Sequence, residues 1–133
     1  MAVPIFENRT FYRGMEYDLT EALVKEVQQR TPYAVSDAGR ADTLLSGQIV
    51  SVDQRLLSRT DSAGLPQELE VEVVINFQWQ DLRTGDVIVD RRGFASVGRY
   101  VPTQPVGQRF EVGQHAAVTR LAQDVVSAMR GDW

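Results

Sequence analysis

Polar and apolar residues alternate along residues 69–80, which read LEVEVVINFQWQ, with one exception at Val74. Successive side chains of a β-strand point to opposite faces of its sheet, so the alternation predicts one long strand with an apolar and a polar face. The apolar face is rich in β-branched and aromatic residues, which favour strands; it consists of Leu69, Val71, Val73, Ile75, Phe77 and Trp79. We expect the helices to cover this face and the polar face to meet solvent or a partner.

Two further long strands are predicted, at residues 43–57 and 87–97. The apolar positions of the first change face near Ile49 and Val50, which indicates a β-bulge or a strong twist. Gly93 stands in the middle of the second, where a glycine is also typical of a bulge.

The N-terminal residues form a short apolar run at 2–6. We predict an edge strand there, because Pro4 has no N–H to donate to a second neighbour. Residues 7–14 are mostly polar and are predicted to form a loop whose Phe11 and Tyr12 pack beneath the helix that follows.

Two segments, 15–30 and 110–130, are predicted to be amphipathic helices, because their apolar residues recur at intervals of three and four. Asp18 and Glu21 have the spacing of a capping box. This spacing is compatible with a start of the regular part of the first helix as late as Asp18. Pro32 ends this helix, because the residue before a proline avoids the helical conformation.

Polar segments at 58–66 and 81–86 join the three long strands into an antiparallel meander, and Gly85 in the second is suited to a positive φ. The predicted fold class is α+β, in the element order β-α-β-β-β-α. We expect a two-layer sandwich in which two amphipathic helices pack on one face of a mixed, mainly antiparallel sheet of about four strands. The length of 133 residues favours a single domain, 1–133.

Composition excludes several functional classes. The chain has no Cys, so disulfides, thiol catalysis and thiolate metal sites are excluded. Its formal net charge is -4, with Lys25 as the only lysine and the arginines dispersed, so we expect no nucleic-acid partner. No apolar run approaches the roughly 20 residues of a membrane-spanning helix.

The sequence carries no pattern typical of an enzyme. His115 is the only histidine, and a single His without Cys or a spaced carboxylate partner is not a metal site. Neither a nucleophile elbow nor a phosphate-binding loop is present. We therefore predict a non-enzymatic protein that requires no cofactor and no metal.

An acidic row, Glu68, Glu70 and Glu72, lies on the polar face of the strand at 69–80. We interpret it as one partner of cross-strand ion pairs rather than as a catalytic carboxylate pair. Arg91 and Arg92 on the following strand are the predicted partners.

Four segments carry a resemblance to a known family: VPIFENRTF at 3–11, LTEALVKE at 19–26, TPYAV at 31–35 and ADTLLSGQI at 41–49. Together with the order of elements, they make the chain similar to the LptE family of outer-membrane lipopolysaccharide-assembly lipoproteins. Family members have two helices on a sheet, which is also the fold derived above from the residues alone.

The resemblance implies a function as well. Members of the family are not enzymes; they bind inside the LptD β-barrel and help to deliver lipopolysaccharide to the cell surface. They are held on the periplasmic side of the outer membrane by a lipid on an N-terminal Cys. This chain contains neither that Cys nor an export signal, so we expect both to have been removed before Val3.

Two sets of binding residues are expected on this basis. The polar loop at 58–66 is the segment we expect to insert into the barrel, whose interior is polar; the predicted contacts are Arg59, Thr60, Asp61 and Ser62. Arginines suit the phosphates of lipopolysaccharide; the candidates are Arg83, Arg91 and Arg92, although surface ion pairing explains these residues equally well.

Two alternatives stay open on the sequence. The first is a general periplasmic scaffold or interaction domain without a lipopolysaccharide role. The second is a small-ligand-binding domain, which predicts an apolar pocket between helices and sheet lined by Phe77 and Trp79, whereas a filled core would argue against it.

Overall fold

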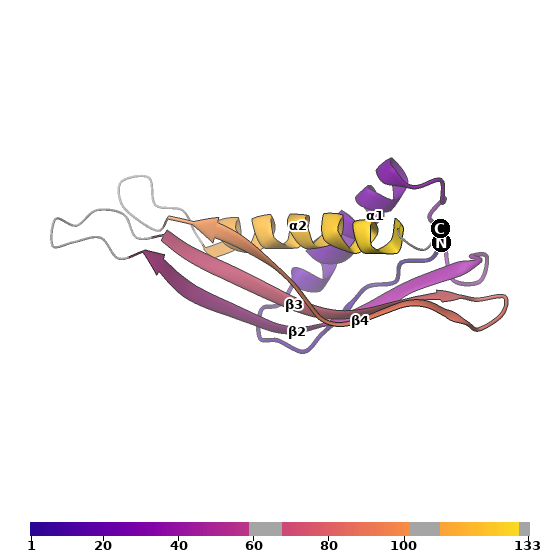
Figure 1. The fold of residues 1–133 in the computed structure, drawn as a ribbon, viewed down its shortest axis with the longest axis horizontal. Coiled ribbons are helices and arrows are strands. Elements are labelled where there is room, and N and C mark those ends of the chain that lie inside the picture. The colour runs from indigo at the N-terminus through magenta and orange to yellow at the C-terminus, as the bar shows by residue number, and fades with distance from the viewer. Residues whose placement is uncertain (59–67, 102–109, 131–133) are drawn as a thin grey trace, which may run out of the picture.

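The computed structural model describes residues 1–58, 68–101 and 110–130 of the chain. Two helices lie on the same face of one four-stranded sheet and form a second layer over it (Figure 1). The elements in order are β1 (Glu7–Asn8), α1 (Met15–Arg30), β2 (Thr43–Ser58), β3 (Glu68–Asp81), β4 (Val87–Tyr100) and α2 (Phe110–Arg130). The predicted α+β class, element order and two-layer arrangement are confirmed.

The sheet has the strand order β1-β2-β3-β4 and is mixed. β1 runs parallel to β2, whereas the pairs β2–β3 and β3–β4 are antiparallel. β3 therefore has a long partner on each side, as its strict alternation of apolar and polar residues predicts.

The apolar face of β3 forms the floor of the core. Its residues Val71, Val73, Ile75, Phe77 and Trp79 are all buried, and they share one hydrophobic core with the buried residues of both helices. The Phe77 ring packs edge-on against Phe94, and the Trp79 ring against Tyr33. These rings fill the space in which the small-ligand alternative places its pocket. Neither described helix is long and apolar enough to cross a membrane.

Both predicted bulges are present. The register of β2 against β3 shifts between Ile49 and Ser51, which moves the inward positions of β2 from odd to even residue numbers. In β4, two residues, Arg92 and Gly93, lie opposite the single residue Asn76 of β3. Gly93 has φ +64° and donates its N–H to Asn76 Oδ1 at 2.9 Å, so the bulge is held by a side chain.

The second layer approaches the sheet most closely where α2 crosses β4. A Cβ on Gly98 would overlap the carbonyl oxygen of Gly113 and lie 2.5 Å from the backbone N of Ala117. A Cβ on Gly113 would lie 2.7 Å from the Tyr100 ring. Glycine at both positions is what allows the two backbones to meet.

The N-terminal prediction is wrong in its position. Residues 2–6 form no strand; Ala2 makes one isolated bridge to Leu44, and the strand pairing begins at β1. Pro4 offers no N–H, and Phe6 donates its N–H to Thr20 Oγ1 rather than to β2, so the stretch lacks a continuous ladder although Ala2 and Phe6 are buried.

One further expectation is corrected near the start of α1. Phe11 does not pack beneath the helix, because its side chain is 99% exposed; Tyr12 instead stacks on Phe110 of α2, with ring centroids 5.0 Å apart. The helix spans Met15–Arg30 as predicted; Gly14 before it takes φ +95°, and Asp18 lies in its first turn.

β4 continues to Tyr100, beyond the predicted end at residue 97. Ser96, Gly98 and Tyr100 are buried on its inward side, so packing against α2 extends the strand.

Candidate binding surface on the open face of the sheet

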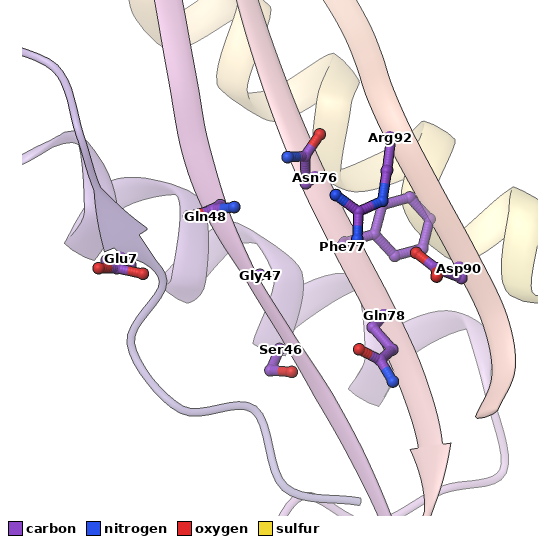
Figure 2. Close-up of a pocket in the computed structure, with 9 residues that line it drawn as sticks. All are labelled: Glu7, Ser46, Gly47, Gln48, Asn76, Phe77, Gln78, Asp90 and Arg92. Atoms are coloured by element: carbon purple, nitrogen blue, oxygen red, sulfur yellow. The ribbon is translucent and has the colours of Figure 1, made fainter. Parts of the chain in front are cut away.

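The face of the sheet opposite the helices is open and carries the even-numbered residues of β3 (Figure 1). It divides into two regions. We name the first the paired region; it consists of Arg55, Glu68, Glu70, Glu72 and Arg99. We name the second the polar depression; it is lined by Glu7, Ser46, Gly47, Gln48, Asn76, Phe77, Gln78, Asp90 and Arg92 (Figure 2).

In the paired region every charged side chain has an oppositely charged neighbour. Arg55 of β2 lies between two carboxylates, with nitrogen–oxygen distances of 3.7 Å to Glu70 and 3.4 Å to Glu72. Arg99 of β4 lies 3.9 Å from Glu68. The acidic row predicted from the sequence therefore does form cross-strand ion pairs.

The predicted partners of that row are wrong. The register places Arg91 opposite Phe77, whereas Glu72 lies opposite Val97 and Glu70 opposite Arg99. Arg91 and Arg92 consequently lie farther along the sheet, next to the bulge. The sequence shows that the charges share neighbouring strands, but only the register decides which of them meet.

The polar depression is contributed by all four strands and has a volume of about 350 Å³. Ser46 of β2 is paired with Gln78 of β3, which is paired in turn with Asp90 of β4. Gln48 and Asn76 form the next row, and Glu7 of β1 stands beside Gln48. Figure 2 shows these side chains on the side of the sheet away from the helices.

Hydrogen-bonding capacity in the depression is largely unused. Asn76 is engaged, through its contact with Gly93. Within residues 1–58, 68–101 and 110–130, the other polar side chains of the depression make no hydrogen bond or ion pair; they are Glu7, Ser46, Gln48, Gln78, Asp90 and Arg92. The depression therefore presents two carboxylates, two free amides, a hydroxyl and a guanidinium to whatever binds there.

The three arginines predicted to contact lipopolysaccharide are not gathered in one place. Arg92 lines the depression. Arg91 is exposed and, opposite Phe77, takes the alternate strand position, which belongs to the other face. Arg83 lies in the β3–β4 turn, 3.9 Å from Asp81 and 4.0 Å from Asp42.

The predicted barrel contacts lie outside the described residues; they are Arg59, Thr60, Asp61 and Ser62. Sequence reasoning did not identify Glu7, Gln48, Gln78 or Asp90 as site residues. Polar alternation along β3 marks Gln78 as surface-facing, but no local signal brings β1 and β4 to the same depression.

Tyr100, which lies away from the open face, has a shifted pKa. Burial raises the pKa of the Tyr100 phenol above its usual value, and the nearby Tyr12 and Glu111 raise it further. The phenol donates a hydrogen bond to Gln54 Oε1 at 2.6 Å.

In the described part of the chain, no group of three His, Asp or Glu side chains is placed to hold a metal ion.

The fold and this surface define a class of protein: a two-layer α+β domain whose helices cover one face of the sheet and leave the other open. The chain belongs to the LptE family, described as lipopolysaccharide-assembly, whose model matches residues 1–129. The match spans every element of both layers. The predicted family is therefore confirmed, and with it a role in lipopolysaccharide assembly.

Solved structures of low sequence identity share the fold. A minor lipoprotein from Acinetobacter baumannii is 18% identical, with a TM-score of 0.53, 95% of this chain and 88% of that chain covered. Protein CT253 from Chlamydia trachomatis is 10% identical, with a TM-score of 0.60 and coverages of 98% and 95%. A PelC dodecamer from Paraburkholderia phytofirmans is 17% identical, with a TM-score of 0.54 and coverages of 96% and 84%. No curated protein matches the sequence.

Proposed function

We propose that this protein is a non-enzymatic component of lipopolysaccharide assembly that binds a β-barrel of the LptD type and aids delivery of lipopolysaccharide to the cell surface. The observation that carries the proposal is the family match over residues 1–129, which includes all the helices and strands. A lipid anchor on the periplasmic side of the outer membrane belongs to the same proposal.

The shape of the molecule supports a barrel-binding role. β2 has 16 residues, so at about 3.3 Å per residue it spans roughly 50 Å. Its far end leads to the β2–β3 connection, and the N-terminus lies at the opposite end of the molecule (Figure 1). An anchor that precedes the N-terminus would thus leave the β2–β3 end free to reach a partner away from the membrane surface.

The polarity of the surface is also suited to a barrel. Barrel interiors are polar and wet, and a protein that binds inside one needs a polar surface of its own. The open face of the sheet has this character in the paired region and in the depression. Arg59, Thr60, Asp61 and Ser62, in the connection that joins β2 to β3, remain the predicted first contacts.

A pulldown from detergent-solubilised outer membranes tests the proposal, with the full-length lipidated protein as bait and mass spectrometry as readout. We expect a large β-barrel to be recovered, and to be lost when residues 59–62 are replaced by Gly and Ser. The matched control carries Ala38→Ser and Arg40→Ser in the exposed turn that precedes β2; it should retain the barrel.

Failure to recover a barrel with a folded and anchored bait would contradict the proposal. Recovery of other envelope proteins in that case would favour a general scaffold. Equal loss of the barrel in the control variant would show that the β2–β3 end is not the specific contact.

A further inference from the structure

We propose that the polar depression binds the saccharide portion of lipopolysaccharide through the hydroxyl groups of the sugar. This inference rests on the proposed function, because lipopolysaccharide assembly specifies the class of ligand. It adds a site, and a chemical part of the ligand, that neither the family nor the fold assigns.

The mixture of donors and acceptors in the depression matches a sugar. Each sugar hydroxyl both donates and accepts a hydrogen bond. The carboxylates of Glu7 and Asp90 only accept, the guanidinium of Arg92 only donates, and the amides of Gln48 and Gln78 do both. Since these groups have no partner among the described residues, a ligand can use them without breaking existing contacts.

The same inventory argues against a phosphate as the ligand. A phosphate needs an excess of donors and positive charge. The depression holds two carboxylates against one guanidinium, so its formal charge is negative. The phosphates of lipopolysaccharide are therefore expected to be bound elsewhere.

The platform beneath these side chains is rigid and of suitable size. Gln48 and Gln78 stand on β2 and β3, and each of these strands is hydrogen-bonded on both sides at this level. The floor includes Phe77, whose ring is packed in the core, and Asn76, which is held by the bulge at Gly93. A volume of about 350 Å³ lies within the range of roughly 300–1,000 Å³ that small-ligand sites occupy.

The charged side chains of the depression are not engaged by one another. Asp90 and Arg92 are two residues apart on one strand and face the same side, yet they form no ion pair with each other or with other described residues. On the same face of the same sheet, Arg55 is engaged by two carboxylates. Charges left unpaired beside free amides are those available to a ligand.

Isothermal titration calorimetry of the whole chain tests the inference, with delipidated and dephosphorylated lipopolysaccharide oligosaccharide as the probe. We expect the wild-type protein to bind it and the double variant Gln48→Ala with Gln78→Ala to bind about tenfold more weakly, because two ligand hydrogen bonds are lost. A variant with Gln28→Ala and Gln123→Ala removes two exposed amides on the helices and should bind like the wild type.

A competition experiment identifies the part of the ligand that is bound. Inorganic phosphate should not displace the oligosaccharide, whereas displacement by phosphate would overturn the saccharide assignment. Absence of binding by the wild type, or equal binding by the depression variant and its control, would also overturn it.

The barrel pulldown separates this inference from the proposed function. We expect the Gln48→Ala, Gln78→Ala variant to recover the barrel normally, which would place saccharide binding in a region distinct from the barrel contact. A variant that lost the barrel while it retained the oligosaccharide would overturn the assignment of the depression. A wild type that bound the oligosaccharide but recovered no barrel would sink the proposed function alone.

Discussion

The paired region and the polar depression lie on one face of one sheet and share its three long strands, yet their polar groups are paired to different extents. In the paired region, Arg55 and Arg99 are held by carboxylates on β3. In the depression, Asp90 and Arg92 have no such partner among the described residues. The charged groups of the first region pair with one another, whereas most polar side chains of the second have no partner among the described residues.

A change of strand geometry separates the two regions. Ser51, Val74 and Ala95 form a cross-strand row between them, and this row carries neither charge nor amide. The bulges of β2 and β4 lie on the depression side of this row, at Ile49–Ser51 and at Gly93. Each bulge moves the residues beyond it by one position, so a single run of alternating residues can serve two surfaces.

The largest expected effect comes from the glycines beneath the two regions. Gly98→Ala should lower the free energy of unfolding by about 3 kcal/mol, because the added methyl meets the backbone of α2, which has no free space to yield. Gly47→Ala, beneath the depression, should cost a similar amount, because the added methyl would overlap the Asn76 carbonyl oxygen of β3 and lie 2.7 Å from the buried Phe6 ring. Urea denaturation followed by circular dichroism measures both.

Gly39→Ala is the control for this pair, since only the end of the Asp37 side chain lies near and the change should stay within about 0.5 kcal/mol. A Gly98→Ala variant as stable as this control would show that α2 does not press on β4 as described.

An intermediate effect is expected at the boundary. Asn76→Ala removes the acceptor of the Gly93 N–H and should cost about 1 kcal/mol in free energy of unfolding. Gln78→Ala, two residues further on the same strand face, removes a side chain that has no bond in the described chain and should change stability by less than about 0.5 kcal/mol. If both substitutions lowered the free energy of unfolding equally in thermal or urea denaturation, the Asn76 amide would not be more important for stability than the Gln78 amide.

The smallest expected effect concerns the ion pairs. A double-mutant cycle of Arg55→Ala and Glu72→Ala should give a coupling of roughly 0.5 kcal/mol that shrinks at high salt, because the pair is partly exposed. The matching cycle of Asp90→Ala and Arg92→Ala should give a coupling near zero at any salt concentration. A coupling energy between Asp90 and Arg92 as large as that between Arg55 and Glu72 would contradict the distinction between a paired and an unpaired region.

Local patterns in the sequence account for the elements. The helices at 15–30 and 110–130 and the burial of alternate residues in β3 follow from the spacing of apolar residues, which is a property of near neighbours. The bulges follow from the change of face near Ile49 and from Gly93. The fold class could therefore be inferred from the chain alone.

The tertiary structure decided which groups meet. Glu70 and Glu72 pair with Arg55 rather than with Arg91 or Arg92, because the hairpin register, set by residues distant in the chain, chooses the opposite neighbours. Likewise, the polar depression exists because the sheet brings β1 beside β2 and β4 beside β3. Periodicity shows which face a side chain takes, but the contact between two side chains depends on how separate strands are aligned.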